Sequence, residues 1–132
     1  MIYAFDTNTL TYFLKKDQNV IRQANEAVAG GNTLMLPPIV DYEVQRGLLA
    51  KRMETQLEKY LSFRQTLPIG VFDEKVWVRA AHIYADLRQK GKLIDEADIL
   101  IGSFCLVNGY TLVTNNIRHF LNISGLKVVN WK

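Results

Sequence analysis

Short, largely apolar runs alternate along the chain with segments in which apolar residues recur every three or four positions. The short runs have the character of buried strands, and the recurring spacing is the pattern of amphipathic helices. The predicted strands span residues 2–5, 33–36, 69–72, 111–114 and 126–129. The predicted helices span residues 10–14, 19–29, 38–65 as a pair, 76–91 and 95–107. This alternation is typical of an α/β protein, and we expect a mostly parallel five-stranded sheet with helices on both faces.

Turn and capping residues set the ends of several of these elements. Thr7 or Asn8 offers an N-cap for the first helix, and Gly30-Gly31-Asn32 ends the second. Pro37-Pro38 cannot continue a strand but suits the start of a helix. No linker or repeat interrupts the pattern, so we expect one domain over residues 1–132.

The composition is that of an ordinary globular protein, with 48% hydrophobic and 22% charged residues in 132. A chain of this length buries a sufficient core without disulfides, and its single cysteine, Cys105, lies in an apolar stretch where a buried thiol is expected. The longest apolar run near the start, Met1 to Phe5, is too short for a signal-peptide core or a membrane span. We therefore expect a cytoplasmic protein.

Acidic and polar residues follow the predicted strands, at the edge where open parallel sheets bind ligands. Asp6 follows the first strand, Glu43 lies about a turn into the helix after the second, and Asn115-Asn116 follows the fourth. Asp95 and Asp98 stand three positions apart at the start of a helix, which places them on one helical face. These side chains are expected to meet in one pocket.

Carboxylates gathered in this way repel one another, so such a cluster is stable mainly when it holds a cation. Oxygen ligands suit Mg²⁺ or Mn²⁺, whereas two histidines and one cysteine are too few for a zinc site of the usual spacing. A bound Mg²⁺ can position phosphate oxygens and activate water. The pattern therefore predicts metal-dependent hydrolysis of a phosphodiester.

The charge balance supports a polyanionic substrate. The net charge is +3, from 16 basic and 13 acidic residues. If four acids share the pocket, only 9 remain elsewhere against the 16 bases, which leaves +7 on the rest of the molecule. A basic surface attracts phosphate while an acidic pocket holds cations.

Each candidate also has a purely structural interpretation. Asp6 could only cap the next helix, Glu43 could be a solvated helix residue, and Asp95 and Asp98 could only balance a helix dipole. The pair Asn115-Asn116 could be a simple turn. His119 lies near the expected site, and we interpret it as a surface residue.

Four motifs stand in order along the chain. Asp6-Thr7-Asn8 ends the first strand, Glu43-Val44 is followed by Gly47, the segment 94–102 carries Asp98, and Thr114-Asn115-Asn116 precedes Phe120. Together they resemble the PIN domain, specifically the VapC-type toxins of bacterial toxin-antitoxin pairs. The resemblance implies a three-layer α/β/α fold and a Mg²⁺- or Mn²⁺-dependent endoribonuclease that cuts structured RNA, with tRNA favoured and rRNA as the alternative. It also implies a homodimer and a VapB-like antitoxin that blocks the site.

The resemblance assigns roles residue by residue. It makes Asp6, Glu43, Asp98 and Asn116 the catalytic residues, with the three acids as metal ligands. Asn116 stands at a position often held by a fourth acid. Because Asn116 is neutral, it binds a second cation less strongly, and Asp95 is the candidate to replace the missing charge. Three polar residues are expected to orient the carboxylates: Thr7, Asn8 and Thr114.

Four residues of the 38–65 helix pair are expected to line a groove that binds the antitoxin: Leu48, Leu49, Met53 and Tyr60.

Two other functions remain open on the residues alone. An Asp after the first strand can be the nucleophile of a haloacid-dehalogenase-like phosphatase, although that family needs a second Asp where Asn8 stands. The chain could also be an RNA-binding module that keeps the fold without the chemistry, a function that the neutral Asn116 favours. The three acids Asp6, Glu43 and Asp98 favour the nuclease.

Overall fold

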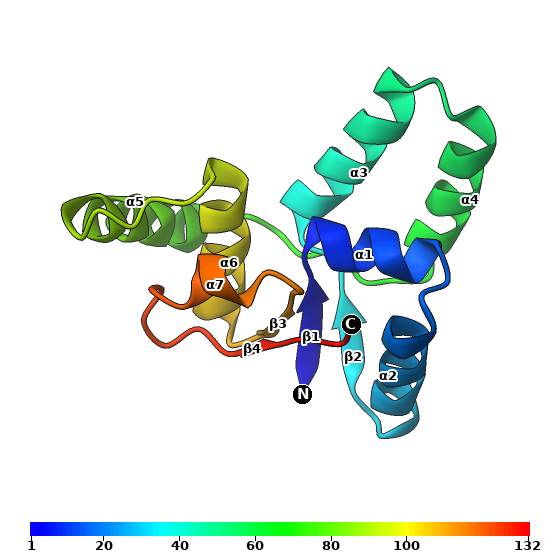
Figure 1. Cartoon of the computed structure of the whole chain (residues 1–132), viewed down its shortest axis with the longest axis horizontal. Helices are drawn as coiled ribbons and strands as arrows, with labels where there is room; N and C mark the ends of the chain where they lie inside the picture. Colours follow the sequence, from blue (N-terminus) through cyan, green and yellow to red (C-terminus); the bar gives the residue numbers. More distant parts are fainter.

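The structure is a computed structural model that describes residues 1–132. A four-stranded sheet lies among seven helices (Figure 1). The strands are β1 (Ile2–Phe5), β2 (Thr33–Met35), β3 (Thr111–Val113) and β4 (Val128–Val129). The helices are α1 (Thr7–Leu14), α2 (Gln18–Ala29), α3 (Pro38–Ala50), α4 (Glu54–Arg64), α5 (Glu74–Gln89), α6 (Glu96–Asn108) and α7 (Ile117–Phe120).

The sheet has the strand order β2-β1-β3-β4, and all of its pairings are parallel. From β1 the chain crosses to β2 on one side and then passes back across β1 to β3 on the other side. Because such crossovers are right-handed, α1 and α2 cover one face of the sheet and α6 and α7 cover the opposite face. The predicted α/β/α arrangement is confirmed, and its ligand-binding switch point lies between β1 and β3.

The sheet has four strands rather than the five predicted. Of the expected strand 69–72, only Ile69 pairs with the sheet, through an isolated parallel bridge to Leu36. Leu36 bonds to Pro68 and Gly70, and the next residue that would donate on this side is Pro38, which has no N–H and begins α3, so the ladder ends there. The chain then leaves the sheet, and Val71 is 75% exposed.

The first helix begins earlier than its apolar pattern indicated. Asp6, rather than Thr7 or Asn8, is its N-cap, because the Asp6 carboxylate accepts a hydrogen bond from the backbone N–H of Thr9. The backbone of Asp6 is still extended, so the strand passes directly into the helix at this residue. The capping role and the site role therefore fall on one side chain.

Helices α3 and α4 form a hairpin that extends beyond the carboxyl ends of the strands (Figure 1). Asp41 joins them, since one of its oxygens accepts hydrogen bonds from Tyr60 and Arg64, each at 2.8 Å, and from Gln45 at 3.0 Å. Burial alone would raise the pKa of Asp41, but the bonds from Arg64, Gln45 and Tyr60 outweigh it and lower that pKa. Tyr60 is 1% exposed, so its prediction as a groove residue was wrong. Its hydroxyl is needed inside the hairpin.

Twenty-four buried apolar residues form one core, and Cys105 is among them, as predicted. Burial raises the pKa of its thiol. No helix in the structure is both long enough and apolar enough to cross a membrane.

Replacing Gly70 by alanine is expected to lower the free energy of unfolding by about 1–3 kcal/mol, the usual cost of overpacking a filled core. A Cβ at this position would overlap the ring of Phe104, which is itself buried. Gly47→Ala is the matched control, because a Cβ there meets nothing within 4 Å and alanine favours the helix by about 1 kcal/mol. Urea unfolding of the two variants measures both effects. Equal stability of the two variants would contradict the expected clash.

Candidate active site

Asp6 and Thr114 stand side by side at the switch point of the sheet. The register pairs Phe5 with Val113, so the next residue of each strand is also adjacent. The Thr114 hydroxyl donates a 2.6 Å hydrogen bond to Oδ2 of Asp6, while Oδ1 accepts the 2.8 Å bond from Thr9. Asp6 is 5% exposed and Thr114 is fully buried. The carboxylate is therefore held at both oxygens in one orientation.

Glu43 reaches the same region from α3. The Thr7 hydroxyl, in the first turn of α1, donates a 2.6 Å hydrogen bond to Oε1 of Glu43. Arg46, one turn further along α3, lies 3.4 Å from Oε2. Two motifs that are 36 residues apart in sequence thus meet through a hydroxyl and a carboxylate.

Asp98 lies in the first turn of α6 and contacts a residue that the sequence analysis placed on the surface. Nδ1 of His119 lies 2.9 Å from Oδ2 of Asp98, and Nδ2 of Asn116 lies 2.9 Å from the same ring nitrogen. The backbone N–H of Asn116 is in turn held by the Thr114 hydroxyl. His119 is a surface residue, with its side chain 41% exposed, but it also lines the pocket and contacts Asp98, a contact that the sequence analysis did not predict. Its spacing of three from Asn116, next to the last motif, is the sequence signal that could have found it.

One pocket of about 220 Å³ collects almost every predicted site residue. Asp95 contributes as the exposed residue before α6, and Thr114 is excluded because it is buried behind Asp6. Asn115 and Gly47 also lie outside the lining. The residues that line the pocket are Asp6, Thr7, Asn8, Glu43, Asp95, Ala97, Asp98, Asn116 and His119.

The electrostatics of this pocket suit a cation. Burial raises the pKa of Asp98, and the neighbouring charges of Asp95 and Asp6 raise it further against the opposing effect of His119. A positive ion among these carboxylates would relieve that repulsion. No three Asp, Glu, His or Cys side chains converge closely enough to form a preassembled metal centre. The donor set nevertheless fits Mg²⁺ or Mn²⁺, since it consists of carboxylate oxygens from separate elements in one pocket.

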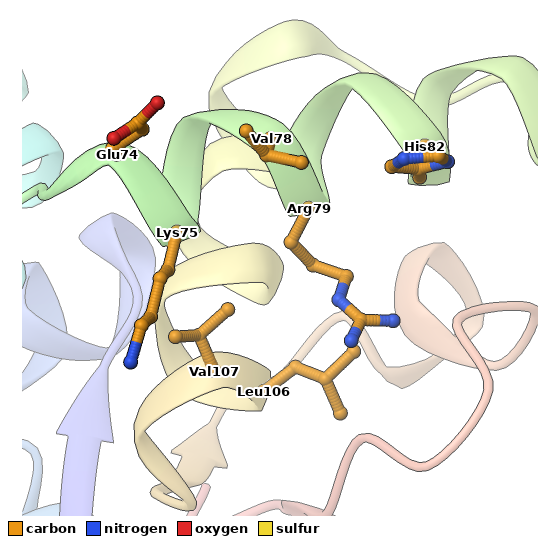
Figure 2. A pocket seen from close by; sticks show the side chains of 7 residues that line it. All are labelled: Glu74, Lys75, Val78, Arg79, His82, Leu106 and Val107. Atoms are coloured by element: carbon orange, nitrogen blue, oxygen red, sulfur yellow. The ribbon is translucent and has the colours of Figure 1, made fainter.

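A second, larger hollow of about 690 Å³ lies between α5 and α6 (Figure 2). Arg79 and Lys75 extend across it over the apolar side chains of Leu106 and Val107, and His82 stands at its end. Its only acid is Glu74. The larger hollow therefore lacks the cluster of carboxylates that lines the smaller pocket at the sheet edge.

The sequence matches a known family over most of its length. A model of the PIN domain matches residues 3–126. The chain is 35% identical to ribonuclease VapC2 of Rickettsia felis over 132 residues, which cover 99% of this chain and 98% of that protein. It is 25% identical to the tRNA(fMet)-specific endonuclease VapC of Salmonella typhimurium over 132 residues, which cover 98% of this chain and 97% of that protein.

The fold is similar to chains in two solved complexes. One is the crystal structure of VapBC2 from Rickettsia felis bound to a DNA fragment from its promoter, with a TM-score of 0.90, 34% identity and 100% of both chains covered. The other is DNA-bound VapBC from Salmonella typhimurium, with a TM-score of 0.89, 23% identity, and 100% and 99% covered. At that lower identity the second likeness bears on the fold alone.

Proposed function

Because the chain belongs to the PIN-domain family, we propose that it is the endoribonuclease toxin of a VapBC-type toxin-antitoxin module. The observation that carries this proposal is the pocket at the β1–β3 switch point, where Asp6, Glu43 and Asp98 arrive from three separate elements. A helix cap or a solvated helix acid would not require these three to share a pocket. The match to VapC ribonucleases extends over nearly the whole length of the chain.

We further propose that the enzyme requires Mg²⁺ or Mn²⁺, held by Asp6, Glu43 and Asp98, with Asp95 supplying additional negative charge. When bound, such a cation neutralises charge on the phosphate oxygens and makes water a better nucleophile at neutral pH. Thr114 and Thr7 fix the orientation of Asp6 and Glu43 through their 2.6 Å hydrogen bonds. Asn116 lacks a charge, so the residues present favour one tightly held cation over two.

The proposed substrate is structured RNA, with tRNA ahead of rRNA. The Salmonella typhimurium relative is named as a tRNA(fMet)-specific endonuclease. The basic surplus outside the pocket would attract the phosphate backbone. We propose the cytoplasm as the site of action, because that is where tRNA is found.

The test is incubation of the purified chain, freed of copurifying partners, with total cellular RNA and Mg²⁺ or Mn²⁺. Discrete fragments with uniform ends are expected, and mapping those ends identifies the RNA and the bond. Intact RNA at every cation concentration, together with retained RNA binding, would instead support the non-catalytic module. An aspartyl-phosphate trapped on Asp6 would support the phosphatase.

Removal of the Thr114 hydroxyl is expected to reduce cleavage by about 10- to 100-fold, the usual effect of losing a group that orients a metal ligand. Thr114→Val keeps the shape of the side chain but removes the bond to Asp6 and the bond from the N–H of Asn116. Thr111→Val is the matched control, since Thr111 is buried in β3, the strand that leads to Thr114, but holds no carboxylate. Initial rates on the mapped RNA measure the difference, and equal rates for the two variants would contradict it.

The proposed partner is a VapB-type antitoxin, since similar chains occur in VapBC complexes. We also propose that the active chain is a homodimer. The proposed docking surface for the antitoxin is the α3–α4 hairpin, to which Glu43 belongs. Leu49 is 60% exposed there, and Leu48 and Met53 are partly exposed. An antitoxin segment on this hairpin would reach the pocket and block it.

Charged residues in place of Leu49 and Met53 are expected to weaken antitoxin binding by at least about tenfold, because each loses apolar contact area and introduces a charge that must be desolvated. Isothermal calorimetry with the cognate VapB-type antitoxin measures the loss. Val28→Lys is the matched control, because Val28 is 55% exposed and belongs to α2, a helix that lies away from the hairpin (Figure 1). Unchanged affinity in the double variant would exclude this surface.

A further inference from the structure

His119 has two hydrogen-bonding groups competing for one ring nitrogen. Nδ1 lies 2.9 Å from the Asp98 carboxylate and 2.9 Å from the side-chain amide nitrogen of Asn116. A neutral imidazole nitrogen either carries one proton or presents one lone pair. It can donate to a carboxylate or accept from an amide N–H, but it cannot do both at once.

The two possible bonds correspond to the two neutral tautomers of the ring. With the proton on Nδ1, the ring donates to Asp98 and Asn116 finds no acceptor there. With the proton on Nε2, Nδ1 accepts from Asn116 and one oxygen of Asp98 is released. The choice between tautomers therefore depends on what else Asp98 binds.

From this geometry, and resting on the proposed function, we propose that His119 is a positioning residue that donates to Asp98 in the cation-free enzyme. When Asp98 binds a cation, His119 releases it and accepts a hydrogen bond from the side-chain amide of Asn116 instead. The exchange needs no change in the net charge of the ring. It also gives Asn116 a role that an acid could not fill, because a carboxylate has no N–H to donate to Nδ1.

The surrounding contacts fit such an exchange. Asn116 is anchored by its backbone, whose N–H bonds to Thr114 and whose carbonyl accepts from the N–H of His119 at 3.1 Å. The side chain of His119 is 41% exposed, so the ring has room to adjust. The Thr114 hydroxyl that anchors Asn116 also donates to Asp6, so the same threonine positions the alternative partner of His119 and a second proposed metal ligand.

The direct test is the tautomeric state of His119, read from two-bond ¹H–¹⁵N correlation spectra of the ring at pH 8, with and without Mg²⁺. The chain has only two histidines, and His82 lies at the α5–α6 hollow, so it serves as an internal reference (Figure 2). We expect the Nδ1–H tautomer without Mg²⁺ and the Nε2–H tautomer with it, while His82 stays unchanged. In Asn116→Asp the Nδ1–H form should persist in both conditions.

Calorimetry with Mn²⁺ supplies a second measurement. His119→Ala is expected to bind Mn²⁺ about three- to tenfold more tightly, because it removes one hydrogen bond that competes for Asp98. His82→Ala should bind like the unaltered chain. Weaker binding by His119→Ala, or an identical His119 tautomer with and without bound Mg²⁺, would overturn the exchange while leaving the metal site standing. Absence of any cation binding would overturn both the proposed metal dependence and this inference.

Discussion

Asp6→Asn is expected to lower the rate of RNA cleavage by at least about a hundredfold, the scale seen when one group that stabilises developing charge is removed. The change replaces a buried negative charge with a neutral amide at the centre of the proposed ligand set. It should leave the fold intact for a specific reason. Asparagine is as good an N-cap as aspartate, and its oxygen can still accept the hydrogen bond from the N–H of Thr9.

Two readouts separate chemistry from folding in this variant. Initial rates on the mapped RNA report the loss of cleavage, and thermal unfolding without added cation should differ from the unaltered chain by only a few degrees. Glu96→Gln is the matched control, because Glu96 is an acid in the first turn of α6, next to Asp95, but lies outside the pocket. It should cut at the normal rate. Normal cleavage by a folded Asp6→Asn variant would exclude Asp6 as an essential group.

Chelation of divalent cations is expected to reduce cleavage to the background rate, and Mg²⁺ or Mn²⁺ should restore it. The physical reason lies in the pocket, where burial and the charges of Asp95 and Asp6 raise the pKa of Asp98. A bound cation lowers the energy of the folded state by stabilising those charges. At a hundredfold excess over Kd this amounts to about 2.7 kcal/mol, or a rise in Tm of roughly 5–10 °C for a chain of this size.

Thermal scans with and without Mg²⁺ measure that rise independently of any RNA. The rise should be much smaller in Asp6→Asn and unchanged in Glu96→Gln, which also separates specific binding from a general salt effect. Cleavage that persists after exhaustive chelation would contradict metal dependence. The PIN-domain fold would be unaffected by that result.

The sequence predicted the α/β class and the main acids because both depend on local features. Apolar runs and helical spacing are set by near neighbours, so most elements fell within a few residues of their predicted bounds. Parallel strands place their carboxyl ends at one edge, so Asp6 and Asn116 were expected together before any contact was known. Both line the pocket, with Glu43, Asp95 and Asp98. That they carry catalysis stays a prediction.

The N-cap at Asp6 was missed locally, but the other errors concern contacts between segments that are far apart in sequence. The expected strand 69–72 failed because its partner segment has no N–H to donate at Pro38, where α3 begins. Tyr60 is buried with its hydroxyl bonded to Asp41, 19 residues away. His119 belongs to the site because α7 carries it to Asp98, 21 residues away. The spacing of apolar residues along the chain does not predict which distant side chains will contact each other.

The sequence by itself determined the order of elements, the carboxylates and the strand ends after which they lie, because these follow from residue type and local period. Only the tertiary structure decided the register that sets Thr114 against Asp6 across 108 residues, and the approach of α7 that gives His119 its two partners. A shift of one residue in that register would move Thr114 away from Asp6 without changing any local pattern. The orientation of the proposed ligands is therefore a property of packing.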